Sequence, residues 1–376
     1  MAHKILIAGA GGIGQATGLI LAEKAVFDCE IYIGDRFLDS AKAAKKFIQE
    51  GANNNTLVEP FVIPESGTSD EFLEVLSKCD IILDCLPGGQ APRLAQLAHE
   101  NNLHYANLTE YVDETNQVTE IATNSNNGFI LQTGLAPGFI NVLAMKLFND
   151  FTSSYGVEKV DKIKMKVGAL SDHVLPPHHY AFTWSPIGVA TEYVKDAIAV
   201  RDYKTVAIQS LDEIGTLIID GQVYEESFTS GGAADLPEAL EGRVRDLDYQ
   251  TLRHPGHYKW ARNIISHTPP TQDTIDHLEK NMLAEIPIVE DDRVIIYATV
   301  IGKDSKGYLR ALEASYNIKP SMVGTKKLRA IQTTTAAPLC EAANMLLTQN
   351  LRGPIFQSMI DPDKFMNGPF VKEIYG

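Results

Sequence analysis

The first 140 residues alternate between short apolar runs and amphipathic stretches, and this alternation limits the folds open to the chain. Apolar runs lie at residues 5–8, 31–33, 58–63, 81–83, 104–108 and 129–131, with helix-like segments at 40–50, 69–77 and 91–101 between them. Strands that are apolar at every position, rather than at every second one, belong to a parallel sheet covered on both faces. Residues 1–140 are therefore predicted to form a doubly wound α/β domain of the Rossmann type.

The sequence pattern changes after residue 140. Segments 161–170, 292–304 and 306–320 alternate between apolar and polar residues, and the last two are joined by turn residues at 304–307. This pattern predicts an antiparallel or mixed sheet with one face in water. A chain of 376 residues is long enough for two domains. We expect residues 141–325 to form a second α+β domain on a mixed sheet, used for substrate binding and dimerisation.

Two later helices have recognisable ends. Ser185 and Pro186 are typical of an N-cap and a first helical position. A helix over about 326–350 is expected to be kinked or interrupted at Pro338 and closed by Gly353. Because that helix is apolar, we expect it to pack back on the first domain.

A glycine cluster follows the first apolar run. Residues 9–14 read Gly-Ala-Gly-Gly-Ile-Gly, which matches the GxGxxG pattern of dinucleotide-binding loops. Gly9 permits the sharp turn, Gly11 lets backbone amides approach a pyrophosphate, and Gly14 lets the helix pack closely on the strand. The amides at the start of the helix, including those of Gly12 and Ile13, favour an anion. A nicotinamide dinucleotide is therefore the predicted cofactor.

Residues at the ends of the next strands refine this prediction. Asp35 ends the second strand 21 residues after Gly14, where a carboxylate accepts hydrogen bonds from the ribose hydroxyls and favours NAD. Arg36 could instead hold the extra phosphate of NADP, so NADP remains possible. Leu86, Pro87 and Gly88 follow the fourth strand, where they form either a cofactor contact or an ordinary strand-to-helix turn.

Composition excludes several classes of function. A formal net charge of -15 argues against nucleic-acid binding, which requires a dense basic surface. No run of about 18 apolar residues occurs, so we predict no membrane span. The four cysteines are scattered and indicate reduced thiols in a cytoplasmic protein. His173, His178 and His179 lack the acidic helix motif of a zinc site, so no metal is predicted.

Several segments, in this order, resemble the saccharopine dehydrogenase-like family. They are the glycine loop, "CLPGG", "TGLAPGFINVLA", "YAFTWSPIGV", "FTSGG" and "DYQTLRHPGH". The resemblance extends over nearly the whole chain. It implies a Rossmann domain, an inserted mixed-sheet substrate domain and a C-terminal helix that returns to the first domain. It also implies a nicotinamide-dependent oxidoreductase of amino-acid metabolism, which interconverts an amine and its imine or carbonyl.

The motifs are divided between branches of this family. Ala136 stands where saccharopine reductases have an aspartate, and "TSGG" and "RHPGH" are similar to lysine 6-dehydrogenase, which acts in lysine metabolism. By contrast, residues 182–189 are similar to the saccharopine enzymes. A carboxynorspermidine-type dehydrogenase is a further alternative within the family. A non-catalytic Rossmann protein that senses nicotinamide cofactors is the alternative outside it.

Amine oxidation of this kind requires a proton acceptor and a group that binds the substrate's carboxylate. His257 or Lys259 is the expected proton-transfer residue, because a histidine titrates near neutrality and burial can lower the pKa of a lysine. Arg253 is the expected carboxylate anchor. Three further residues are candidates for the substrate pocket: Thr229, Ser230 and Trp184. The expected partners are a small amino-acid-like substrate and a second copy of the chain.

Overall fold

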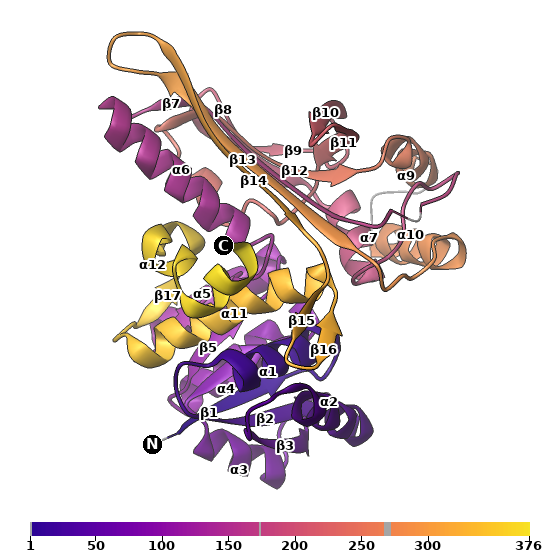
Figure 1. Ribbon diagram of the computed structural model, residues 1–376, viewed down its shortest axis with the longest axis vertical. Coiled ribbons are helices and arrows are strands. Elements are labelled where there is room, and N and C mark those ends of the chain that lie inside the picture. Colours follow the sequence, from indigo (N-terminus) through magenta and orange to yellow (C-terminus); the bar gives the residue numbers. More distant parts are fainter. Residues whose placement is uncertain (1, 173, 267–271) are drawn as a thin grey trace. The chain divides into compact units, whose positions relative to one another are not determined.

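The chain divides into two compact units. The computed structural model describes residues 2–172, 174–266 and 272–376. The first unit runs from the N-terminus to Phe139 and also contains Ser321–Leu328 and Gln332–Gly376, whereas the second contains Ile140–Pro320 and Arg329–Ile331 (Figure 1). Both chain termini therefore belong to the first unit.

A parallel sheet of seven strands forms the centre of the first unit. Its strands are β1 (His3–Ala8), β2 (Cys29–Asp35), β3 (Leu57–Val62), β4 (Ile81–Asp84), β5 (His104–Asn107), β6 (Gly128–Ile130) and β17 (Gly353–Ile355). They lie in the order β17-β6-β5-β4-β1-β2-β3, so the direction of strand addition reverses between β1 and β4. This arrangement confirms the predicted doubly wound fold, in which ligands bind at that reversal.

Five helices connect these strands: α1 (Gly12–Lys24), α2 (Leu38–Gly51), α3 (Asp70–Lys78), α4 (Ala91–Glu100) and α5 (Val112–Thr123). Ser69 caps α3, because its side chain accepts a hydrogen bond from the amide of Phe72. The strands are buried on both faces, as their continuous apolar sequence requires; Ile5, Ile7 and Ile33 have no exposed surface.

The C-terminal segment differs in part from the prediction. Helix α11 (Ala330–Thr348) runs without a break through Pro338 and ends at Thr348. Gly353 does not close this helix; with a φ of +67° it begins β17, which pairs with β6. Strand β17 has only three residues, which is too short for an apolar run that would predict it. The short helices α12 (Pro362–Met366) and α13 (Pro369–Tyr375) follow, and Tyr375 stacks on Phe139 at 3.6 Å between ring centroids.

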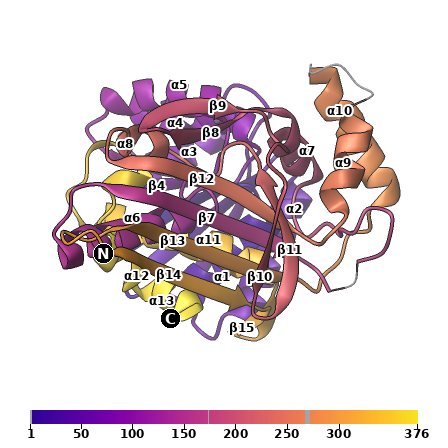
Figure 2. The ribbon, with the colours of Figure 1, turned by 90° about the horizontal axis from the view of Figure 1, so that it is seen from above.

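A mixed sheet of eight strands forms the centre of the second unit, as predicted (Figure 2). The main path is β10 (Gly215–Ile219), β11 (Gln222–Phe228), β12 (Val244–Arg253), β7 (Val160–Leu170), β13 (Arg293–Lys303) and β14 (Leu309–Ile318). Strands β8 (Ala197–Arg201) and β9 (Lys204–Ile208) branch from β12. β12 and β7 are parallel and the other pairs are antiparallel. The small hairpin of β15 (Ser321–Val323) and β16 (Lys326–Leu328) belongs to the first unit.

Helices of the second unit are α6 (Phe139–Tyr155), α7 (Pro186–Val194), α8 (Leu236–Ala239), α9 (His257–Ile265) and α10 (Gln272–Glu285). The predicted start of α7 is confirmed, because the Ser185 side chain accepts a hydrogen bond from the Gly188 amide at 3.3 Å. A buried cluster joins α7, α9 and α10 and includes Tyr193, Tyr258 and Met282. Tyr180 and Tyr193 of this cluster pack against the ring of His257.

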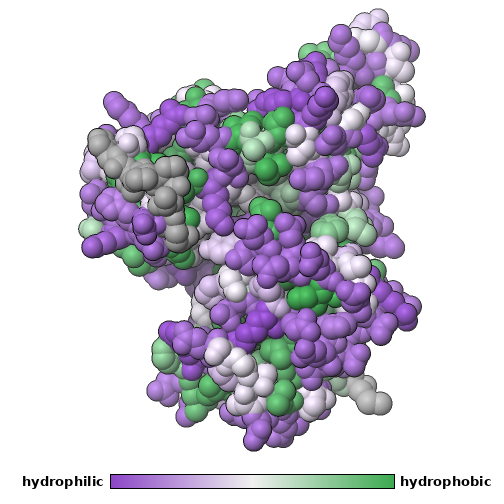
Figure 3. Space-filling view, turned by 180° about the vertical axis from the view of Figure 1, so that it is seen from behind, coloured by the Kyte–Doolittle hydropathy of each residue, from purple (hydrophilic) through white to green (hydrophobic). Residues whose placement is uncertain are grey.

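The helices, one face of the surface and the cysteines each bear on the environment of the protein. None of the helices in the described ranges is long and apolar enough to cross a membrane. Figure 3 shows one face of the molecule, on which hydrophilic residues dominate and hydrophobic residues form small separate patches. All four cysteines are free thiols.

Candidate active site

The glycine loop joins β1 to α1 with an open space above it. Gly9 has a φ of +104°, and a Cβ there would lie 2.8 Å from the carbonyl oxygen of Cys85. A Cβ on Gly14 would lie 1.8 Å from the carbonyl oxygen of Gly9, whereas one on Gly11 would meet nothing within 4 Å. Gly9 and Gly14 are therefore required by packing. Gly11 faces empty space that a side chain would fill.

This geometry fits the pyrophosphate of a dinucleotide. Gly11 and Gly12 are exposed at the start of α1, and Gly11 precedes the helix without any side-chain cap. The first amides of a helix have no partner within it, and together with the helix dipole they favour an anion. Gly9, Gly11, Gly12, Ile13 and Gly14 would thus hold a dinucleotide through backbone groups alone.

The strand ends beside the loop contribute the other predicted cofactor residues. Asp35 ends β2, and its carboxylate accepts hydrogen bonds from the amides of Ala10 at 3.0 Å and Phe37 at 3.1 Å. The segment after β4 lies against the loop, because the Cys85 amide donates to the Ala8 carbonyl at 2.8 Å. Leu86 is half-buried there and Pro87 is exposed. The structure therefore brings the three predicted segments of the cofactor site together.

Gly88 has a packing reason of its own. A Cβ at this position would lie 2.3 Å from the hydroxyl oxygen of Thr109 and 2.7 Å from the ring of Tyr111. The glycine thus lets the turn after β4 approach the segment after β5. This close approach is sufficient to explain the glycine, so its contact with a cofactor stays a prediction.

Asp84 is a buried carboxyl at the same edge of the sheet. It accepts hydrogen bonds from the Tyr105 hydroxyl at 2.7 Å and the Leu86 amide at 2.9 Å. Burial raises its pKa to about 7, against the lowering effect of these two bonds. Sequence reasoning missed Asp84, because an acid at a strand end reads as an ordinary turn residue.

Arg253 lies at the end of β12 with 1% of its surface exposed. Its Nε donates to the Tyr193 hydroxyl at 2.7 Å, and one Nη donates to the Leu252 carbonyl at 2.9 Å. The guanidinium lies 4.8 Å from the ring centre of Tyr180. Its second Nη, Nη2, is buried without a hydrogen-bond partner among the described residues, and the carboxylate of Glu192 acts on the guanidinium through its charge. A buried cation in this state is available to an anionic ligand.

His257 is fully buried behind this arginine. Its Nδ1 donates to the His178 carbonyl at 2.6 Å, so its Nε2 accepts from the Tyr193 hydroxyl at 2.9 Å. Tyr193 in turn accepts from Arg253, which makes a continuous chain of hydrogen bonds. Burial, with help from the charge of Arg253, lowers the pKa of His257 to about 3. His257 is therefore neutral, and both ring nitrogens are occupied.

The other predicted substrate residues divide into two groups. Thr229 and Ser230 are buried next to the same cluster: the Thr229 hydroxyl lies 2.6 Å from that of Thr251, and the Ser230 amide donates to the Glu192 carbonyl at 3.0 Å. Trp184 is half-buried and packs against the cluster that contains Tyr193. Lys259 is separate, because it lies on the exposed side of α9, away from the buried His257.

Tyr193 and Tyr180 are the residues of this neighbourhood that sequence reasoning missed. Tyr193 lies seven residues after Pro186, on the buried side of α7 with Val189. Buried tyrosines at helical spacing normally form part of a core, and their hydroxyls require a partner. The need of a buried tyrosine hydroxyl for a hydrogen-bond partner is the feature of the sequence that could have indicated these residues, but it does not identify the partner.

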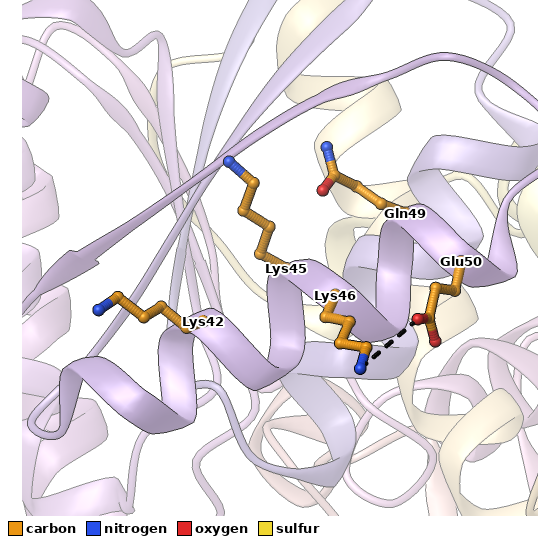
Figure 4. Close-up of a pocket in the computed structure, with 5 residues that line it drawn as sticks. All are labelled: Lys42, Lys45, Lys46, Gln49 and Glu50. Atoms are coloured by element: carbon orange, nitrogen blue, oxygen red, sulfur yellow. Dashed lines mark ion pairs between the residues drawn. The ribbon is translucent and has the colours of Figure 1, made fainter.

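No group of metal ligands lies among the residues that the structure describes. In the described ranges no three His, Cys, Asp or Glu residues gather as metal ligands; His173 lies outside these ranges. A shallow surface hollow of about 290 Å³ lies along α2, as Figure 4 shows. Its lining residues are Lys42, Lys45, Lys46, Gln49 and Glu50. Lys45 and Lys46 pair with Glu59 and Glu50, so we assign this hollow no ligand.

The fold and the glycine loop define a dinucleotide-binding protein with a second, mixed-sheet unit. Residues 5–127 match the family model described as the saccharopine dehydrogenase NADP binding domain, and residues 134–375 match the saccharopine dehydrogenase C-terminal domain. The chain therefore belongs to the saccharopine dehydrogenase family, which confirms the resemblance in its sequence. It follows that NAD(P) is its cofactor and that it is an oxidoreductase by family.

Two solved structures share this fold over almost the whole chain. Apo saccharopine dehydrogenase (L-Glu forming) from Saccharomyces cerevisiae has a TM-score of 0.71 at 14% identity, covering 99% of this chain and 97% of that one. Homospermidine synthase from Legionella pneumophila, in complex with NAD, has a TM-score of 0.66 at 12% identity, covering 100% and 90%. At such identities the likeness concerns the fold.

Curated relatives match over shorter segments. Alpha-aminoadipic semialdehyde synthase from Arabidopsis thaliana is 29% identical over 122 residues, which are 32% of this chain and 11% of that protein. Shikimate dehydrogenase (NADP(+)) from Halothermothrix orenii is 35% identical over 89 residues, or 24% and 28%. The matched segments thus span less than a third of either relative.

Proposed function

We propose that this protein is an NAD(P)-dependent dehydrogenase that interconverts an amino-acid-derived amine and its imine or carbonyl. Lysine and saccharopine-like secondary amines are the proposed substrates. The observation that carries this proposal is Arg253: a buried guanidinium whose Nη2 has no hydrogen-bond acceptor among the described residues. A substrate carboxylate would supply the missing acceptor.

The residues around Arg253 support this assignment. Tyr193 accepts from Nε and Leu252 accepts from one Nη, so the orientation of the guanidinium plane is fixed before any ligand binds. His257 orients Tyr193 from behind. Preorganisation of this kind lowers the entropy cost of holding a substrate. We propose Thr229, Ser230 and Trp184 as further members of the pocket wall.

Proton transfer is proposed separately. The bound nicotinamide would accept or return the hydride, while a protein group takes the amine proton. With a pKa of about 3 and both nitrogens occupied, His257 is a poorly matched base near neutral pH, and we propose that it positions Tyr193. Lys259 stays a candidate from the sequence, but it is exposed on the side of α9 away from His257, so we do not place it at the pocket.

A substrate panel tests this function. Purified protein is incubated with NAD⁺ or NADP⁺ and with lysine, saccharopine or carboxynorspermidine, and reduced nicotinamide is followed by its absorbance. We expect turnover with at least one substrate, and a Tyr193→Phe variant with KM raised about tenfold at similar kcat, because Arg253 loses its orienting partner. Dinucleotide binding without turnover of any substrate would contradict the proposal and favour a non-catalytic nicotinamide sensor.

Assembly and location are also proposed. Among the strands of the described residues, β14 pairs with β13 alone, so its other edge is available to a second copy of the chain. We propose a homodimer formed through the sheet of the second unit, which sedimentation of the purified protein would test; a monomer at micromolar concentration would contradict it. The four free thiols support a reducing compartment, and we propose the cytoplasm.

A further inference from the structure

Arg36 directly follows Asp35 at the end of β2, and an acidic side chain holds it. Its Nη1 lies 3.1 Å from an Oε of Glu65, and its guanidinium lies 4.6 Å from the ring centre of Phe37. An arginine at this strand end is the group that ordinarily receives the 2′-phosphate of NADP. Here the guanidinium already has a carboxylate partner.

The segment that carries Glu65 is fixed by a second arginine. Arg93, at the start of α4, donates to the carbonyl oxygens of Pro64 at 2.8 Å and Gly67 at 2.9 Å, and to the Gln90 side chain at 2.9 Å. These bonds fix both ends of the turn that presents Glu65. They also occupy both terminal nitrogens of Arg93, and its Nε is buried, so this second guanidinium does not face a phosphate.

Asp35 completes the negative charge of this edge. Both of its carboxylate oxygens accept backbone amides, from Ala10 and Phe37, so its position at the end of β2 is fixed. A carboxylate placed there accepts the ribose hydroxyls of NAD and repels a phosphate at the same point. Arg36 therefore follows one acid, Asp35, in the sequence and pairs with a second, Glu65.

We propose that Glu65 is a specificity-determining residue of the cofactor site. By pairing with Arg36, it removes the cation that would bind the 2′-phosphate, and the protein binds NAD(H) in preference to NADP(H). This inference depends on the dinucleotide site alone and not on the substrate proposed above. It extends the assignment beyond the family description, which names NADP.

One other cation on the neighbouring helix competes for this role. Lys42 lies on α2 and has no ion-pair partner among the described side chains, and Figure 4 shows it at one end of the α2 hollow. If Lys42 were the cation that binds the 2′-phosphate, any gain in NADPH binding in the Glu65 variant would depend on Lys42 and not on Arg36. Variants of both residues separate these routes.

The test is direct titration of the protein with NADH and NADPH, followed by nicotinamide fluorescence or calorimetry at low salt. We expect tighter binding of NADH by the unaltered protein. In Glu65→Gln, NADPH binding should improve about two- to fivefold with NADH binding unchanged, because an exposed ion pair of this kind contributes up to about that factor. NADH binding also verifies that the variant is folded.

Matched variants complete the design. Glu59→Gln breaks another exposed pair, with Lys45, in the same unit, and should leave the NADH to NADPH ratio unchanged. The improved NADPH binding of Glu65→Gln should disappear when Arg36→Ala is added. It should persist when Lys42→Ala is added instead. The proposal is overturned if the unaltered protein prefers NADPH, if Glu65→Gln leaves the ratio unchanged, or if Arg36→Ala alone weakens NADPH binding several-fold.

Discussion

The glycine loop of the first unit and the Arg253 cluster of the second bind their proposed ligands by opposite physical means. The loop uses backbone amides, is exposed at Gly11 and Gly12, and owes its shape to the absence of side chains. The Arg253 cluster uses side chains and is buried, and it owes its shape to hydrogen bonds between Arg253, Tyr193 and His257.

This difference determines how each region responds to substitution. In the loop, a methyl group on Gly11 would occupy the ligand's space without touching the protein. A methyl group on Gly14 would instead overlap the backbone of Gly9. In the cluster, the buried charge of Arg253 is held by the Tyr193 hydroxyl and the Leu252 carbonyl, with the charge of Glu192 acting on it, so its burial is compensated within the folded protein. A substitution at Gly11 should therefore weaken ligand binding alone, whereas a substitution at Arg253 should change both the stability of the protein and its binding of substrate.

The largest expected effect is that of Arg253→Met. Methionine replaces the buried cation with an apolar side chain of similar length but removes the donor to the Tyr193 hydroxyl and the Leu252 carbonyl, so the free energy of unfolding should fall by about 1–3 kcal/mol. The kcat/KM for the amine substrate should fall about a hundredfold or more, because the buried charge partner of the carboxylate is lost. Denaturant unfolding and steady-state kinetics measure the two quantities. A loss of stability together with unchanged KM would show that Arg253 has a purely structural role.

A smaller effect is expected from alanine in the glycine loop. Gly11→Ala should leave the unfolding free energy within about 0.5 kcal/mol, since its Cβ meets nothing within 4 Å, while dinucleotide affinity falls about tenfold. Gly14→Ala is the matched variant and should lose stability by about 1–3 kcal/mol as well, because its Cβ would overlap the Gly9 carbonyl. Calorimetric titration with NADH and thermal unfolding distinguish the two. Equal stability of both variants would contradict the packing role assigned to Gly14.

The smallest effect is a difference in pH dependence between the regions. The pKa of His257 is lowered from 6.5 to about 3, so the stability it contributes is present above about pH 6.5 and lost as the pH falls toward 3. The pKa of Asp84 is raised from 3.8 to about 7, so its contribution is present below about pH 3.8 and lost as the pH rises through 7. Asp84→Asn should flatten the loss between pH 4 and 7 in urea unfolding. His257→Gln should remove the rise in stability between about pH 3 and 6.5, and a change of the opposite sign in either variant would contradict these environments.

Much of the first unit could be predicted from its sequence. The strands around Ile7, Ile33 and Ile82 are apolar at every position, and that pattern depends only on burial on both faces. Gly9 and Gly14 are equally local, because their steric requirements involve residues close to them in the loop or beside it in the sheet. Strand β17 was missed, since a three-residue strand that begins Gly-Pro forms only by pairing with β6.

The candidate site was predictable only in part. Arg253 was identified from its residue type, but its partner Tyr193 lies 60 residues away in the chain and His257 is 64 residues from Tyr193. The proposed base His257 could not be judged from sequence, because its pKa depends on burial and on the His178 carbonyl. Likewise, Arg36 was ambiguous until Glu65, 29 residues further on, was found beside it.

By itself, the sequence determined the parallel sheet, the glycine loop and the acid that follows it. These features rest on steric limits and on a periodicity that neighbouring residues impose on each other. The tertiary structure alone decided the partner of each cation: Arg36 pairs with the Glu65 carboxylate, and the Nη2 of Arg253 is buried without a hydrogen-bond acceptor among the described residues. The physical reason is that the free energy of a charge depends on the groups and the dielectric around it, which the fold assembles from distant parts of the chain.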